Sequence, residues 1–430
     1  MNRKILNIAL PSIVSNITVP LLGLVDTTIS GHMGSPIYIA AVAVGSMIFN
    51  VVYWLCGFLR MGTSGITAQT LGKRDLDGVA SQLAMSMTVA LGIAAAIIVL
   101  QTPLGHAAIA VINPPADTLD ATWAYFRICV WGAPAMLCLY SLTGWYIGMQ
   151  NTRIPMLISI VQNVVNIIAS LTFVYGMRMG VEGVALGTLT AQWAGLAMSI
   201  SLWTRNYGNR LFKRIRWSCI LDTNAMGSFF NVNRDIFVRT LFIVSVNFYF
   251  LSAGASQGTV ILAVNTLLMQ LFTLFSYVMD GFAYAGEALC GRLHGAGNST
   301  ELNHTIRRLF AWGTALATAY TIVYAVGGNA FLALLTDNTK VIEASEAYQY
   351  WAVLIPLCGM AAFIWDGVFI GITATRGMLV SSVASAVLFF AVYIAMRQQL
   401  HNHALWIAFL TYLMSRGIMQ TLIFKTSTRQ

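Results

Sequence analysis

Residues 19–34 of the chain read VPLLGLVDTTISGHMG and place one carboxylate, Asp26, inside the first long apolar run. A carboxylate well inside a membrane helix costs roughly 2.5–3.5 kcal/mol on insertion scales, so it normally faces a wet cavity or a partner rather than lipid. Pro20 precedes it, and an interior proline removes a backbone hydrogen bond and kinks its helix. The pattern suggests a proton or cation site with a hinge at Pro20; the alternative is a structural aspartate that pairs with a neighbouring helix.

The composition is that of a polytopic membrane protein. Of 430 residues, 57% are hydrophobic and only 9% are charged, whereas about a quarter of the residues of a soluble domain are charged. The first apolar run, from Ile5 to about Ser30, is too long for a signal-peptide core and lacks a cleavage pattern. We therefore expect a retained spanning helix. The net charge of +9 lies in short loops, which indicates membrane orientation and not nucleic-acid binding.

Twelve segments are long enough to cross a hydrocarbon core of about 30 Å. They cover about 5–30, 37–62, 79–101, 119–147, 154–177, 181–204, 229–252, 258–290, 306–328, 345–371, 377–397 and 402–425. With the N-terminus inside, sixteen lysines and arginines fall on the cytoplasmic side, and only Arg178, Lys340 and Arg397 fall outside. The positive-inside rule then predicts that both termini lie in the cytoplasm. We expect the protein to lie in the inner membrane.

An internal repeat relates the two halves of the chain at a spacing of 223 residues. The matches are Gly72 with Gly295, Ala124-Tyr125 with Ala347-Tyr348, Ile147-Gly148 with Ile370-Gly371, and Thr152-Arg153 with Thr375-Arg376. We predict two six-helix lobes, 1–204 and 228–430, joined by a basic cytoplasmic linker at 205–227. Because each lobe has an even number of spans, the repeat is parallel, and any pathway is expected between the lobes.

Further acids lie within or near the apolar runs of the second half. Asp280 and Glu287 are seven residues apart, so they share one stripe of a helix that lines a cavity or forms a structural polar cluster. Asp366 lies toward the cytoplasmic end of its helix and is a candidate for a gate, a hinge or a ligand group. Tyr284 and Trp365 are aromatic candidates for the same substrate cavity, because aromatic faces attract cations; core packing is the alternative.

Two further polar groups have competing interpretations. Asp235 and Arg239 are four residues apart and are predicted to form a structural ion pair on one helix face. Asn163 and Asn166 share a face and offer uncharged oxygen ligands, although amides also join membrane helices. Thr188 and Gln192 lie on the next helix, where packing is the default role.

No catalytic pattern is present in the sequence. The six histidines are scattered, and no nucleotide-binding loop, H-E-x-x-H, G-x-S-x-G or Cys/His cluster occurs. We therefore expect no enzyme activity, no cofactor and no metal site. Without a nucleotide-binding loop, uphill work would have to come from an ion gradient.

Four stretches closely resemble one transporter family. They are SNITVPLLGLVDT at 15–27, NRDI at 233–236, DGFAYA at 280–285 and DGVFIG at 366–371. Together they resemble the DNA-damage-inducible (DinF) branch of the multidrug and toxic compound extrusion (MATE) transporters, over essentially the whole chain. The resemblance implies a V-shaped pair of six-helix lobes that exports organic, often cationic or amphipathic compounds in exchange for protons or sodium. It also implies that Asp26 and Asn166 belong to the coupling site of the N-terminal lobe.

The chain departs from this family pattern at two positions. Ser170 stands where the family usually has an aspartate, and Gln192 stands where branch members can carry a glutamate. Asp26 is therefore the only acid expected to be buried in the first lobe. One carboxylate suffices to bind and release a proton, whereas sodium generally prefers more formal charge and several oxygens. Asn163, Asn166, Thr188, Ser170 and Gln192 remain candidate coordinating groups.

These observations predict a monomeric multidrug antiporter coupled to protons, with sodium as the less favoured ion. Its partners would be amphipathic or cationic small molecules, the coupling ion and the lipid bilayer. The alternative of the same class is a flippase for a lipid-linked precursor, which cationic cavity residues would favour. An intramembrane enzyme or a passive scaffold is a further alternative, against which the missing catalytic cluster and the buried acids argue.

Overall fold

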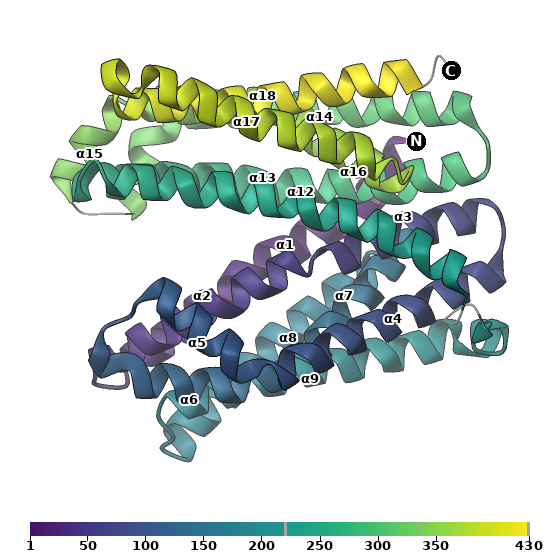
Figure 1. Cartoon of the computed structure of the whole chain (residues 1–430), viewed down its shortest axis with the longest axis horizontal. Coiled ribbons are helices and arrows are strands. Elements are labelled where there is room, and N and C mark those ends of the chain that lie inside the picture. Colours follow the sequence, from purple (N-terminus) through teal and green to yellow (C-terminus); the bar gives the residue numbers. More distant parts are fainter. Residues whose placement is uncertain (219–221, 336–337, 428–430) are drawn as a thin grey trace. The chain divides into compact units, whose positions relative to one another are not determined.

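The computed structural model describes residues 1–218, 222–335 and 338–427, and within these ranges every regular element is a helix (Figure 1). The first half contains α1 (Asn2–Gly31), α2 (Pro36–Leu55), α3 (Phe58–Gly72), α4 (Leu76–Val99), α5 (Gln101–Ile112), α6 (Leu119–Cys129), α7 (Ala133–Gly148), α8 (Arg153–Leu171) and α9 (Val181–Trp203). The second half contains α12 (Thr223–Ala255), α13 (Thr259–Gly295), α14 (Ser299–Leu335), α15 (Thr339–Glu346), α16 (Gln349–Gly371), α17 (Thr375–Leu400) and α18 (Asn402–Ser427). The prediction of an all-α polytopic membrane protein is confirmed.

The helices follow the expected spans closely. In the described part of the chain, eleven helical stretches are long and apolar enough to cross a membrane, two of which combine shorter helices: α2 with α3, and α6 with α7. The twelfth expected span, 181–204, is formed by α9, which has 23 residues but is not one of the eleven. Thr188, Thr190 and Gln192 lower the hydropathy of α9, so its polar residues distinguish it from the other spans.

The chain forms two compact units, and their boundaries follow the sequence repeat. One unit is Leu10–Asn233, and the other combines Met1–Ala9 with Arg234–Gln430. The first helix of each half, α1 and α12, therefore changes unit after Ala9 and after Asn233 respectively. These two points are separated by the repeat spacing to within one residue.

The repeat also appears as two equivalent helix crossings. A Cβ atom added to Gly144 of α7 would lie 2.2 Å from the carbonyl oxygen of Arg60 in α3, and one added to Gly367 of α16 would lie 2.2 Å from the carbonyl oxygen of Ala283 in α13. Both members of one crossing are 223 residues from their counterparts. The same relation recurs one turn later for Gly148 against Ser64 and for Gly371 against Glu287. Small residues let membrane helices approach closely, so these glycines set the helix contacts of each unit.

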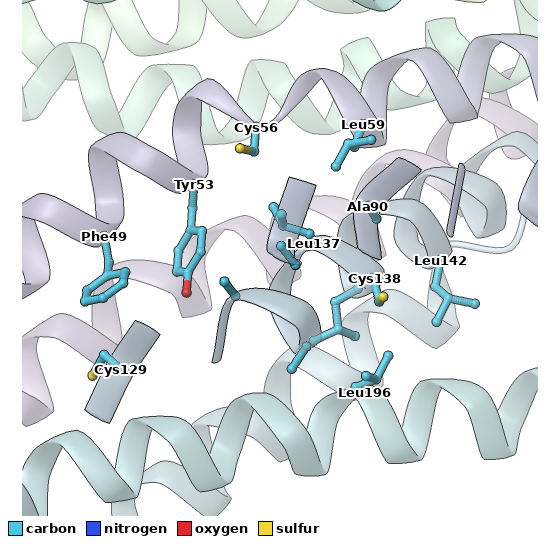
Figure 2. Packing of buried hydrophobic residues seen from close by; sticks show 14 of the residues in the cluster. Phe49, Tyr53, Cys56, Leu59, Ala90, Cys129, Leu137, Cys138, Leu142 and Leu196 are labelled. Atoms are coloured by element: carbon cyan, nitrogen blue, oxygen red, sulfur yellow. The ribbon is translucent and has the colours of Figure 1, made fainter. Parts of the chain in front are cut away.

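The unit Leu10–Asn233 has a core of packed apolar side chains (Figure 2). Phe49 of α2 stacks on Phe126 of α6 with 5.3 Å between the ring centroids. The hydroxyl of Tyr146 in α7 donates to the carbonyl oxygen of Ser199 in α9 over 2.8 Å. A buried phenol needs such a partner, and this one fixes α9 against α7. The polar residues of α9 are thereby held in place.

Candidate functional site

Asp26 lies at a junction of three helices. Its side chain is buried, with 3% of its surface exposed. The hydroxyl of Thr188 in α9 donates to Asp26 Oδ2 over 3.2 Å, and Asn166 Nδ2 in α8 donates to Thr188 Oγ1 over 3.2 Å. The side chain of Asn166 also lies within interaction range of the Asp26 carboxyl. The structure therefore brings together three residues from three helices. We call these three residues, together with Ser170 of α8, the N-unit polar site.

Close packing of α8 against α9 creates this site. A Cβ atom on Gly187 would lie only 2.0 Å from the Oγ atom of Ser170, so only glycine fits at this point. Thr188 follows Gly187 directly, and Asn166 precedes Ser170 by one helical turn, so their side chains meet where the helices touch. Asn166 and Ser170 are fully buried. Ser170 thus places a small hydroxyl beside the tight crossing.

Several oxygen atoms at this site lack a hydrogen-bond partner among the described residues. They are Asp26 Oδ1, Asn166 Oδ1 and Ser170 Oγ. Asn166 Oδ1 can only accept hydrogen bonds, and so can Asp26 Oδ1 as long as the carboxyl is ionised. Because buried polar atoms are normally satisfied, these two acceptors call for a further positive or hydrogen-bond-donating group beside them. A proton on the carboxyl or a small cation would supply it.

The remaining candidates of the first half lie apart from these contacts. Asn163 Nδ2 donates to the carbonyl oxygen of Ser159, while its Oδ1 atom has no partner in the described chain. Gln192 packs against Gly132, where an added Cβ atom would lie 1.7 Å from Gln192 Oε1. Within the described residues, neither amide is hydrogen-bonded to Asp26. Pro20 lies inside α1, which continues as one helix from Asn2 to Gly31.

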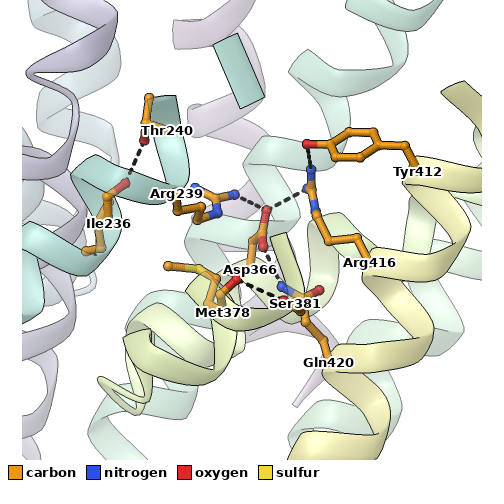
Figure 3. Close-up of polar contacts among 9 residues, drawn as sticks. All are labelled: Ile236, Arg239, Thr240, Asp366, Met378, Ser381, Tyr412, Arg416 and Gln420. Atoms are coloured by element: carbon orange, nitrogen blue, oxygen red, sulfur yellow. Dashed lines mark hydrogen bonds and ion pairs between the residues drawn. The ribbon is translucent and has the colours of Figure 1, made fainter. Parts of the chain in front are cut away.

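A charged cluster occupies the second unit, Arg234 onward (Figure 3). Asp366 of α16 receives hydrogen bonds from Arg239 of α12 and, over 2.8 Å each, from Arg416 and Gln420 of α18. Arg416 also donates to the hydroxyl of Tyr412 over 3.2 Å. All five side chains are buried. We call Asp366, Arg239, Arg416, Gln420 and Tyr412 the Asp366 cluster, which ties α12, α16 and α18 together.

The predicted ion pair between Asp235 and Arg239 is wrong. Arg239 pairs with Asp366, while Asp235 contacts Arg234 over 3.4 Å and accepts a hydrogen bond from the Thr375 hydroxyl over 3.2 Å. The four-residue spacing places both side chains on one face, but it does not prevent the long arginine from reaching a neighbouring helix. A buried guanidinium is stabilised most by a buried carboxylate that also receives further hydrogen bonds.

Asp366 and Trp365, two proposed substrate-cavity residues, have packing partners. The indole nitrogen of Trp365 donates to Thr421 Oγ1 over 2.7 Å, and its ring lies 4.8 Å from that of Phe424. Asp366 is engaged by three donors, as described above. Both residues are therefore occupied within the C-terminal unit, where they join α16 to α18.

Asp280, Tyr284 and Glu287 follow one another along α13. Glu287 is buried, whereas Asp280 and Tyr284 are partly buried. Asp280 lies near enough to Arg416 to interact electrostatically with it. Asp280 thus adds a second acidic side chain near Arg416 of the Asp366 cluster.

Sequence reasoning gave no role to Arg416 or Gln420. Both lie in an apolar run of α18, and an ionisable residue in such a run is itself a signal for a buried partner. The signal does not identify the partner, because Asp366 is 50 residues away from Arg416. No group of three or more His, Cys, Asp or Glu residues suited to a metal ion occurs in the part of the chain that the structure describes.

The fold and its buried polar groups define a polytopic membrane transporter. The family model described as MatE matches residues 11–172 and 236–394, one stretch in each half, so the chain belongs to the MatE family. The resemblance to the multidrug and toxic compound extrusion family is thereby confirmed. Members of this family are transporters of small molecules across a membrane and not enzymes.

Individual relatives agree with this assignment. The chain is 35% identical to DNA damage-inducible protein F of Escherichia coli (strain K12), over 100% of this chain and 93% of the relative. It is 23% identical to multidrug resistance protein MdtK of Edwardsiella ictaluri, over 100% of this chain and 96% of the relative. A crystal structure described as MATE in the bent conformation matches with a TM-score of 0.90 and 17% identity, over 99% of this chain and 95% of that chain. The last match concerns the fold alone.

Proposed function

We propose that the chain is a proton-coupled antiporter that exports cationic or amphipathic organic compounds across the inner membrane. It acts as a monomer with both termini in the cytoplasm, and sodium is the less favoured coupling ion. Family membership supports the transport of small molecules, and the name of the relative MdtK connects the family with multidrug resistance. The excess of basic residues in the loops assigned to the cytoplasm supports the orientation.

The unpaired hydrogen-bond acceptors around Asp26 are the main support for a proton as the coupling ion. Asp26 Oδ1 and Asn166 Oδ1 are buried and have no donor among the described residues. Protonation converts the carboxyl of Asp26 into a hydrogen-bond donor, so a single proton supplies the donor that these acceptors lack. Sodium would need several oxygens and is favoured by more formal charge than one carboxylate supplies, and Ser170 removes the second acid. The donor set therefore favours a proton.

The proposed mechanism connects protonation of Asp26 to the shape of α1. Asp26 and Pro20 lie on the same helix, and the missing hydrogen bond at Pro20 makes bending there easier. Protonation of Asp26 from the outside removes the negative charge of the carboxyl and weakens its hydrogen bond with the Thr188 hydroxyl. The helix α1 then rearranges around Pro20 as substrate leaves. One charge that moves through 100 mV supplies about 2.3 kcal/mol, which corresponds to roughly a fiftyfold gradient of a neutral substrate.

The alternative of a lipid-linked precursor flippase needs accessible cationic groups for a phosphate. The buried arginines of the second unit do not meet this requirement, because Arg239 and Arg416 both donate to Asp366. The carboxylate of Asp366 compensates their positive charge inside the protein. This pairing supports an exporter of organic cations over a carrier of a phosphorylated lipid.

Dye efflux from proteoliposomes tests the proposal, with a pH gradient and a sodium gradient imposed separately. We expect the pH gradient alone to drive export of an ethidium-type dye, and Asp26→Asn to abolish it. Asp120→Asn, which neutralises an exposed acid of α6, is the matched control and should transport normally. Export that requires sodium would overturn the choice of ion. The absence of dye export under both gradients would overturn the exporter and favour the flippase.

A further inference from the structure

The segment that follows α9 is ordered on the first unit. It continues through a helical turn at Thr204–Gly208, α10 at Asn209–Leu211 and a turn at Phe212–Arg214, and we call residues 204–218 the linker segment. The ring of Tyr207 lies 5.0 Å from that of Trp145, and its hydroxyl accepts a hydrogen bond from Asn151 Nδ2 over 2.9 Å. Leu211 is buried. Part of the linker segment is thus packed against the helices.

An ion-pair network fixes the end of the same segment to the start of α4. Arg214 and Arg216 donate to the two carboxylate oxygens of Asp77 over 3.1 and 2.7 Å. The backbone nitrogen of Arg216 donates to Ser81 Oγ over 3.0 Å. Exposed ion pairs contribute little to stability individually. A double pair with a backbone hydrogen bond nevertheless restricts where the segment can lie.

Three further cations of the segment remain available. Arg205, Arg210 and Lys213 are exposed and make no ion pair within the described residues. The sequence contains no acidic residue from Gly183 to Leu221. Asp77, which does contact the segment, is already shared by two arginines. The linker segment therefore presents uncompensated positive charge at the end of a membrane helix.

Two large aromatic side chains lie among these cations and point outward. Phe212 is 64% exposed and Trp217 is 63% exposed. Full exposure of such groups to water is unfavourable, whereas aromatic rings with lysine and arginine beside them are typical of the membrane interface. The segment directly follows the spanning helix α9, so the headgroup region of the bilayer is within reach.

We propose that the linker segment binds the headgroups of anionic phospholipids in the adjoining leaflet through Arg205, Arg210 and Lys213. Phe212 and Trp217 insert at the interface and hold the cations at headgroup depth. A basic loop that only determines membrane orientation would need neither the exposed aromatics nor the anchoring through Asp77. A phosphate diester is the chemical group recognised, because guanidinium groups donate to phosphate in a planar, bidentate manner.

Quenching of tryptophan fluorescence by brominated lipid tests this proposal in the intact protein. Vesicles contain phosphatidylcholine and phosphatidylglycerol in fixed proportion, with bromine on one lipid or the other. The contribution of Trp217 is the difference between wild type and Trp217→Phe. We expect brominated phosphatidylglycerol to quench Trp217 severalfold more, per mole of lipid, than brominated phosphatidylcholine. One basic side chain near an anionic surface changes lipid occupancy by about fivefold.

Neutralisation of the three cations provides the discriminating comparison. In the variant R205Q/R210Q/K213Q the preference for phosphatidylglycerol should disappear, whereas R178Q/K340Q/R397Q, which removes three exposed cations elsewhere, should retain it. High salt should weaken the preference of the wild type even if the first variant folds poorly. Equal quenching by both lipids, or no quenching of Trp217 by either, would overturn the proposal. No transport is measured, so the result is independent of the coupling ion.

Discussion

The hydroxyl of Thr188 in α9 donates to Asp26 Oδ2 in α1 across 162 positions of sequence. The same hydroxyl accepts a hydrogen bond from Asn166 Nδ2, so one oxygen atom connects three helices. A hydroxyl that is held by a fixed donor has its own proton directed to the carboxylate. Thr188 therefore orients the only carboxylate of the N-unit polar site.

Replacement of Thr188 by valine is expected to reduce export driven by a pH gradient about tenfold or more. Valine keeps the shape of threonine but leaves Asp26 and Asn166 without their shared partner, and a hydrogen bond to a charged group contributes about 1.5–3 kcal/mol. Thr188→Ser retains the hydroxyl and should keep most of the wild-type rate. Initial rates in proteoliposomes with equal protein content measure this. Equal rates for the valine and serine variants would contradict the assigned role.

Introduction of an acid at position 170 is expected to give the protein a sodium dependence. Ser170 Oγ is buried beside the N-unit polar site, and a second carboxylate would add the formal charge and oxygens that sodium favours. The variant Ser170→Asn introduces a side chain of nearly the same size as Ser170→Asp but without its charge. Comparison of the two variants therefore separates the effect of charge from the effect of crowding at Gly187. Dye export is measured with a sodium gradient alone. A sodium response in both variants, or in neither, would argue against the charge-based explanation.

The fold was predictable because hydropathy and the repeat are properties of the chain itself. Asp26, Asn166 and Thr188 were also recognisable, since each is a polar residue in an apolar run. Their mutual contacts were not, because partners on different helices are set by helix packing and not by local spacing. Gly187 allows α8 and α9 to approach closely, but its contact with Ser170 cannot be deduced from the sequence.

The Asp366 cluster shows the opposite case, in which a local rule led to the wrong partner. The spacing of Asp235 and Arg239 satisfies the pattern of a helical ion pair. Arg239 instead reaches Asp366, 127 residues away, whose carboxylate also receives hydrogen bonds from Arg416 and Gln420. In a low-dielectric interior, a carboxylate that several donors stabilise is a better partner for a buried arginine than a carboxylate that is merely close along the same helix.

Removal of the central charge of this cluster is expected to destabilise the protein strongly. Asp366→Asn leaves Arg239 and Arg416 without their shared carboxylate, and a broken buried ion pair typically costs about 3–5 kcal/mol. The triple variant R239L/D366L/R416M removes all three charges and should recover much of the lost stability. Thermal unfolding in detergent measures both variants. A single variant as stable as the wild type would mean that the cluster contributes little to the fold.

Enlargement of the crossing glycine in the second unit, Gly367, is expected to lower stability. A Cβ atom on Gly367 would meet the backbone oxygen of Ala283, which cannot move without shifting α13. Overpacking of this kind costs about 1–3 kcal/mol. Gly92→Ala in α4 is the control, because no atom lies within 4 Å of its added Cβ and alanine favours the helix by up to about 1 kcal/mol. Gly144→Ala, the repeat equivalent, should behave like Gly367→Ala in thermal unfolding. If Gly367→Ala instead matched Gly92→Ala, the two crossings would not be the close backbone contacts that define each unit.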